Sequence, residues 1–249
     1  AARALAPALH VQQLRDISFS RFVRSLPGRP PPTLKIVARF DPQAPASVQV
    51  VGSSDVRAPD GRILVRDREQ FRATVVLGAA LAVPVRTFAE ETGALAVEDP
   101  YYADGAPVQL SGPFQATTDA RSHPAGGLAR WTPRAGGIRG AALPVVLLDA
   151  LLRTVAIHRV AAATAAPIAA VPRSIERVTL YGESGDDAAY ADAYADIVLR
   201  YAAATGACTA HTADGRVLAE IAGLRMADLA EVSARPQGAP MPSPQAADA

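Results

Sequence analysis

The chain has 249 residues, 49% of them hydrophobic, and its 25 basic and 24 acidic side chains leave a formal net charge of +1. This balance gives no argument for nucleic acid or an anionic membrane as a partner, and no apolar run in the sequence is long enough to cross a membrane. Cys208 is the single cysteine, which excludes an intrachain disulfide and favours a reducing, cytoplasmic location. Because the sequence begins at Ala1 without methionine, we expect it to be part of a longer protein.

The first part of the chain is predicted to consist mainly of strands. Residues 1–9 have the composition of the last turns of a helix, and residues 14–19 then alternate between apolar and polar, as in a half-buried strand. Asp60 and Gly61 are predicted to form a turn. The other extended segments are predicted over residues 34–40, 47–53, 63–66 and 71–77.

The second part is predicted to combine one long helix, from Leu143 to a point before Pro167, with further strands. A tight turn is expected at Asp214 and Gly215. The extended segments are predicted over residues 114–121 and 127–131, which form a hairpin around 123–126, and over 174–180, 196–201, 207–212 and 216–226. From residue 233 the sequence is rich in Pro, Ala, Gln and Ser, which is typical of disorder.

The predicted helix that begins at Leu143 is apolar on every side. Pro144 suits its first turn, where a backbone N–H has no partner in the helix. A helix of this kind is normally buried in a core. Asp149 is its only acid, and a buried carboxyl group is costly unless it is paired or takes part in chemistry.

The two halves of the sequence repeat one order of elements: a helix, three strands, an Asp-Gly turn and a long strand. The local sequence is similar as well, with Asp60-Gly61-Arg62-Ile63-Leu64 in the first half and Asp214-Gly215-Arg216-Val217-Leu218 in the second. A repeat of about a hundred residues is too long for a solenoid unit. It indicates an antiparallel sheet wrapped around its helix, twice.

Several segments resemble the motifs of polyketide synthase dehydratase domains, which are double hot-dog folds. The helix segment Leu143-Pro144-x-x-Leu147-Leu148-Asp149-Ala150 resembles their "hP-x-LLDA" motif. The others are Gly112-Pro113-Phe114-Gln115, Val171-Pro172-x-x-Ile175-Glu176-x-Val178 and Asp214-Gly215-Arg216-Val217-x-x-x-Ile221-x-Gly223-Leu224. Residues 71–75 are most similar to iterative types, such as polyunsaturated fatty acid or enediyne synthases.

The resemblance implies an α+β double hot-dog fold, with two antiparallel sheets that each wrap around a long central helix. Residues 1–88 would be the first hot dog, truncated at its N-terminus and lacking its leading strand and part of its helix. Residues 89–232 would be the second, and 233–249 a disordered tail. The implied partners are an acyl carrier protein, neighbouring synthase domains and a second copy in a homodimer.

The resemblance also implies a reaction, in which water is eliminated from a 3-hydroxyacyl chain on the carrier protein to give a trans-2-enoyl product. It assigns the general acid to Asp149, whose pKa burial on the helix is expected to raise. The substrate is carried on phosphopantetheine, and neither a cofactor nor a metal is implied. Residues implied along an acyl tunnel are Tyr102, Phe114, Leu143, Pro144 and Pro172.

Two departures from the family pattern leave an alternative open. The family's base is a histidine in an H-x-x-x-G-x-x-x-x-P segment before the first helix; His10 and His123 lack this spacing, so the base lies upstream of Ala1 or is missing. Arg153 stands where the family has Gln or His, one turn after Asp149, and an ion pair there would lower the pKa of the acid. The alternative is a catalytically degenerate double hot-dog module that scaffolds the synthase or binds its carrier protein.

Other polar residues are predicted to be structural. His158, on the helix, is expected to be packed or capped, and His211 is expected to be exposed near the last turn. The acids at positions 186, 187, 192 and 196 are expected to be solvated, since they lack the spacing of a calcium loop.

Overall fold

The protein was analysed as a computed structural model, which describes residues 2–6, 8–21, 33–58, 60–89, 93–102, 110–134, 137–162 and 170–228. The tail predicted over 233–249 lies outside the described residues. The described chain is mostly antiparallel sheet with few helices, as the alternation in the sequence indicated.

The first half of the chain forms four antiparallel strands. Its elements are α1 (Ala2–Leu5), β1 (His10–Phe19), β2 (Lys35–Asp41), β3 (Ala44–Arg57) and β4 (Ile63–Gly78). The strands lie in the order β2-β3-β4-β1, and the predicted segments 63–66 and 71–77 are one continuous strand, β4. Within residues 2–89, α1 is the only helix that the structure describes, and it contacts β3.

The second half contains the long predicted helix, α2 (Val145–Ala162), and the remaining strands. Its other elements are β5 (Leu95–Ala96), η1 (Gly112–Phe114), β6 (Thr117–His123), β7 (Gly126–Trp131), β8 (Ala170–Leu180), α3 (Asp187–Ala193), β9 (Val198–Ala202), β10 (Ala207–His211), β11 (Val217–Ala222) and β12 (Arg225–Asp228). The predicted hairpin is confirmed, with His123 opposite Gly126. The strand predicted over 216–226 is wrong as a single element, because the backbone turns at Gly223, where φ is 66°, and β12 then pairs with β8.

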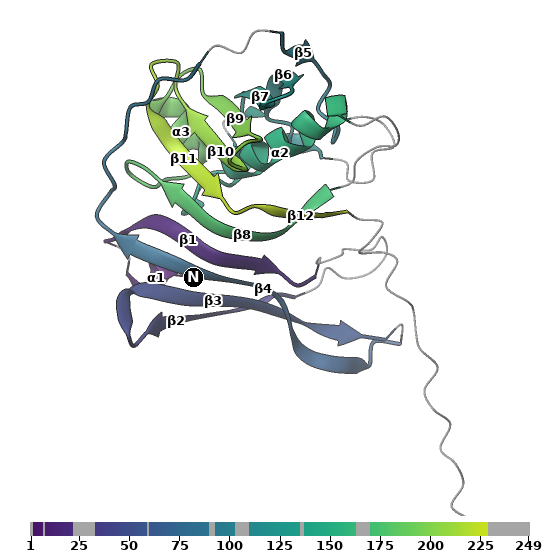
Figure 1. Cartoon of the computed structure of the whole chain (residues 1–249). Coiled ribbons are helices and arrows are strands. Elements are labelled where there is room, and N and C mark those ends of the chain that lie inside the picture. Colours follow the sequence, from purple (N-terminus) through teal and green to yellow (C-terminus); the bar gives the residue numbers. More distant parts are fainter. Residues whose placement is uncertain are drawn as a thin grey trace, which may run out of the picture.

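The twelve strands that the structure describes join one sheet in the order β2-β3-β4-β1-β8-β11-β10-β9-β7-β6-β5, with β12 also paired to β8. Its second half curves around α2 (Figure 1), which contacts β6, β7, β9 and β10. Leu147, Leu151 and Ile157 of α2 are fully buried against the sheet, and each such side chain contributes about 1.5–3 kcal/mol of hydrophobic stabilisation. The prediction of a core helix is therefore confirmed.

Glycine allows β7 to approach α2 closely. A Cβ atom on Gly127 would lie 2.3 Å from the carbonyl oxygen of Thr154, well inside any normal contact. The same stretch of α2 is tied to the hairpin by Ser122, whose hydroxyl donates to the carbonyl oxygen of His158 at 3.0 Å. The Nδ1 atom of His158 lies 3.0 Å from the carbonyl oxygen of Gly126, so the predicted packed role of this histidine is confirmed.

The two halves meet where β1 pairs with β8, along the middle of the sheet (Figure 1). The segment over residues 81–89 then runs along β11, and the Arg86 guanidinium binds both carboxylate oxygens of Glu220. Phe88 stacks on His211 with ring centroids 3.8 Å apart. The prediction that His211 is exposed is wrong: it is 6% exposed, because this connecting segment covers it.

Three strands contain an aspartate in the left-handed backbone conformation. Asp16 in β1, Asp67 in β4 and Asp119 in β6 have φ values of 51°, 47° and 49°. Each lies at a shift in the register of its strand with a neighbour. Aspartate tolerates this conformation better than most residues, and such bulges increase the local bend and twist of a strand. They therefore contribute to the curvature of the sheet.

Candidate active site

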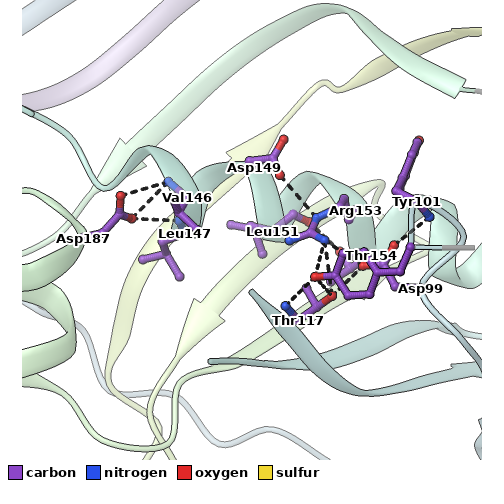
Figure 2. Close-up of polar contacts among 11 residues, drawn as sticks. Asp99, Tyr101, Thr117, Val146, Leu147, Asp149, Leu151, Arg153, Thr154 and Asp187 are labelled. Atoms are coloured by element: carbon purple, nitrogen blue, oxygen red, sulfur yellow. Dashed lines mark hydrogen bonds and ion pairs between the residues drawn. The ribbon is translucent and has the colours of Figure 1, made fainter. Parts of the chain in front are cut away.

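Helix α2 is capped by a side chain from another element. Pro144 directly precedes the helix, rather than lying in its first turn as predicted, and its carbonyl oxygen accepts the N–H of Leu148 at 2.9 Å. Proline has no side-chain acceptor for the free N–H groups of the first turn. The carboxylate of Asp187, the first residue of α3, accepts them instead, from Val146 at 3.0 and 3.1 Å and from Leu147 at 3.0 Å (Figure 2). Asp187 is 0% exposed, so the prediction of a solvated acid is wrong at this position.

Asp149 lies on α2 among residues that are fully buried, including Ala150. Its own side chain is 34% exposed. The Oδ2 atom is buried and has no hydrogen-bond partner among the described residues, although it lies 3.3 Å from Nε of Arg153. One oxygen therefore faces the protein interior, while part of the side chain remains accessible to a ligand.

The guanidinium of Arg153 makes its hydrogen bonds on the side away from Asp149 (Figure 2). Its Nη1 atom donates to Oδ2 of Asp99 at 2.8 Å, to the hydroxyl of Tyr102 at 2.7 Å and to the hydroxyl of Thr117 at 3.3 Å. The side chains of Arg153 and Asp99 are 4% and 2% exposed, so this is a buried ion pair. The guanidinium also lies over the ring of Tyr102, 5.2 Å from its centroid.

Asp99 is itself held in place by its surroundings. Its Oδ1 atom accepts the backbone N–H of Tyr101 at 3.0 Å, and the hydroxyl of Thr117 donates to its Oδ2 atom. The backbone N–H of Thr117 donates to the hydroxyl of Tyr102 at 2.8 Å. Asp99 and Thr117 could not be identified as site residues from the sequence, because neither forms part of a motif. They are 54 and 36 residues from Arg153 in the chain, and the fold alone brings them together.

Burial raises the pKa of Asp149 from its ordinary value of 3.8 to about 6. The positive charge of Arg153 opposes this shift, and the negative charge of Asp99 adds to it. Both effects expected from the sequence are therefore present, and burial is the larger. A carboxyl group with this pKa retains its proton in about one tenth of the molecules at pH 7, which suits a general acid.

The residues predicted to line an acyl tunnel lie in different parts of the second half. Tyr102 belongs to the polar network around Arg153. Phe114, in η1, and Leu143 are half-buried and pack against the core. Pro144 is buried before α2, and Pro172 lies on β8 opposite Met226 of β12. A tunnel through these residues stays a prediction.

Other features of the described ranges lie apart from Asp149. Two of the surface cavities among the described residues, one of about 250 Å³ beside Trp131 and one of about 530 Å³ lined by β1, β8 and the turn at Gly223, are not lined by Asp149. Over the described ranges, no group of three or more His, Cys, Asp or Glu side chains is arranged to hold a metal ion. None of the helices in these ranges is long and apolar enough to cross a membrane.

The chain is similar in sequence and fold to polyketide synthase dehydratase domains. The family model described as "Polyketide synthase dehydratase N-terminal domain" matches residues 114–236. Among solved structures, the dehydratase domain from the CurF module of curacin polyketide synthase is 16% identical with a TM-score of 0.65, and the alignment covers 91% of this chain and 80% of that chain. A trans-AT polyketide synthase dehydratase domain from Brevibacillus brevis is 14% identical with a TM-score of 0.64, covering 88% and 76%. No curated protein matches the chain in sequence.

The antiparallel sheet curved around an apolar helix is the hot-dog fold found in polyketide synthase dehydratase domains. Residues 114–236, which include α2 and Asp149, belong to the polyketide synthase dehydratase domain family, as the resemblance predicted. At 14–16% identity, the likeness to the solved structures establishes the fold, and it extends beyond the family match over most of the chain.

Proposed function

We propose that the chain is a dehydratase-type domain of a polyketide or polyunsaturated fatty acid synthase, acting on 3-hydroxyacyl chains held by an acyl carrier protein. The observation that carries this proposal is Asp149, an acid on the apolar helix of a polyketide synthase dehydratase fold, with its pKa raised to about 6. The proposal includes a double hot-dog arrangement with halves over residues 1–88 and 89–232. Neighbouring synthase domains and a second copy of the chain are the other proposed partners.

In the proposed reaction, a base removes a proton from C2 of the acyl chain. The electron pair of the C2–H bond forms the C2=C3 double bond, and the C3–O bond breaks. Asp149 donates its carboxyl proton to the departing hydroxyl group, which leaves as water, and the product is a trans-2-enoyl thioester. The elimination involves no change in overall oxidation state, so an acid and a base suffice.

Related structures support this pairing of acid and base. Two variants of the curacin CurK dehydratase, one with a histidine replaced by phenylalanine and one with an aspartate replaced by asparagine, are described as inactive mutants. By analogy, Asp149 takes the role of the acid here. A histidine in an H-x-x-x-G-x-x-x-x-P segment before the first helix would take the role of the base.

The test is a dehydration assay on the synthase polypeptide that carries this chain. The substrate is a 3-hydroxyacyl N-acetylcysteamine thioester, and the enoyl product is measured by mass spectrometry. Asp149→Asn should lower turnover by at least about 100-fold, which is the lower range for loss of a general acid. The matched control is Asp119→Asn, an exposed acid on β6, which should leave turnover unchanged. Equal turnover by wild type and Asp149→Asn would refute the assignment.

A second function is favoured by Arg153, which stands beside the acid where the family has Gln or His. In this second function, the chain is a catalytically degenerate double hot-dog module that scaffolds the synthase or binds its carrier protein. This function predicts no enoyl product from the wild-type protein, while a phosphopantetheinylated carrier protein still binds in calorimetry. Turnover that depends on Asp149 would exclude it.

A further inference from the structure

The contacts of Arg153 present a problem for an acid at Asp149. A guanidinium 3.3 Å from a carboxyl group normally stabilises the anion and so removes the proton that a general acid must donate. Yet among the described residues this contact forms no hydrogen bond, since both Nε of Arg153 and Oδ2 of Asp149 lack a hydrogen-bond partner. The guanidinium is therefore held close to Asp149 without being bonded to it.

The position of the guanidinium is explained by Asp99. The Arg153–Asp99 contact is shorter, at 2.8 Å, and is a hydrogen bond between two side chains that are almost fully buried. Tyr102 and Thr117 accept from the same Nη1 atom and so orient it toward Asp99. Charge-assisted hydrogen bonds of this kind are stronger than hydrogen bonds between neutral groups.

We propose that Asp99 is a positioning residue, which draws the guanidinium of Arg153 away from Asp149 and leaves this carboxyl group available to donate a proton to the substrate. At Asp149, the opposite charges of Arg153 and Asp99 largely cancel. The guanidinium therefore does not hold the Asp149 carboxyl group in its ionised form. This inference rests on the proposed function of Asp149.

The other charged and titratable groups around Asp149 do not take over this role. Tyr101 lies in the loop between Asp99 and β6, and burial raises its pKa to about 12, so it stays neutral while Asp149 titrates. Arg159, which follows Arg153 on α2, is exposed, and its charge acts on Tyr101. Arg153 is therefore the cation that acts on the charge of Asp149, and it opposes the effect of burial.

The experiment measures the titration midpoint of Asp149 directly, by the carbon chemical shift of its carboxyl group in protein labelled at aspartate, with Asp149→Asn used for assignment. Asp99→Asn should free the guanidinium to pair with Asp149 and lower the midpoint by about 1–3 units. The double variant Asp99→Asn with Arg153→Gln removes both charges, and its midpoint should return to the wild-type value or above it. Asp119→Asn is the matched control and should titrate as wild type.

Two results would overturn the proposal: an unchanged midpoint in Asp99→Asn, or a double variant whose midpoint stays as low as that of the single one. If Asp99→Asn does not fold, Thr117→Val decides, since it removes one hydroxyl from the network and leaves both charges in place. Its midpoint should fall in the same direction, and no fall would count against the proposal. These readouts need no turnover, so expected shifts in a protein without dehydratase activity would refute the proposed function and leave the positioning role intact.

Discussion

Replacing Asp187 by alanine should destabilise the protein strongly, because this carboxylate is the cap of α2. It accepts the N–H groups of Val146 and Leu147 and a longer bond from Ile138 at 3.3 Å. Loss of a capping side chain costs about 0.5–2 kcal/mol, and each buried N–H left without an acceptor adds about 1–3 kcal/mol. We expect a loss of about 3–5 kcal/mol from the free energy of unfolding, a large share of the usual 5–15 kcal/mol.

Asparagine at the same position should be much less damaging. Its amide oxygen can accept the N–H groups. Asparagine is also neutral, so it avoids burying a negative charge, which is the cost that raises the pKa of the Asp187 carboxyl above its ordinary value. We expect Asp187→Asn to lie within about 1 kcal/mol of wild type. Asp192→Ala, an exposed acid on the same short helix, should change stability by less than about 0.5 kcal/mol.

Urea unfolding followed by tryptophan fluorescence measures these differences. Trp131 is the single tryptophan and is 6% exposed, so its emission reports the loss of the core. An Asp187→Ala protein as stable as wild type would refute the capping role. If Asp187→Asn were as unstable as Asp187→Ala, the negative charge rather than the acceptor geometry would be what stabilises the start of α2.

The remaining predictions concern the acid, the hairpin and the thiol. The pKa of Asp149 is raised from 3.8 to about 6 in the folded state, so its ionisation costs stability as pH rises from 3.8 to about 6. Asp149→Asn should be about 1 kcal/mol more stable than wild type at pH 7, after allowance for partial exposure, and urea titrations should show this difference vanish below pH 3.8. Gly127→Ala places a methyl group against the Thr154 carbonyl and should cost about 1–3 kcal/mol in thermal unfolding, whereas Ala125→Ser at the exposed hairpin turn should not. Cys208 is 0% exposed with its pKa raised to about 12 by burial, so it should react with Ellman's reagent only after unfolding, and rapid labelling of the folded protein would contradict its position in the core.

Local patterns in the sequence predicted most of the strands and the central helix. The all-round apolar stretch after Leu143 predicted a buried helix, and α2 confirms it. The Asp214-Gly215 pair predicted a turn, and Gly215 there donates to the carbonyl oxygen of Thr212 between β10 and β11. These features depend on a few neighbouring residues, which is why a single sequence contains them.

Features that depend on distant contacts could not be predicted in this way. Asp187 looks like one of several exposed acids, and its role appears only when α3 is placed against the start of α2. His211 is buried because Phe88, far away in the chain, stacks on it. For the candidate site, the sequence predicted Asp149 and Arg153 but not Asp99, so it could show that the two charges would meet and not which partner Arg153 would prefer.

The pairing of β1 with β8 has a consequence for any attempt to produce half of the chain by itself. Five positions of β8 pair with β1, from Ser174 to Thr179, so β8 is an interior strand of the sheet. A fragment that starts near residue 89 would turn it into an open edge, with unpaired backbone groups beside the apolar side chains of Ile175 and Val178. Such edges pair readily with other chains and lead to aggregation. The second half would therefore need its edge masked, for example by charged residues on β8, before it could be handled as a separate module.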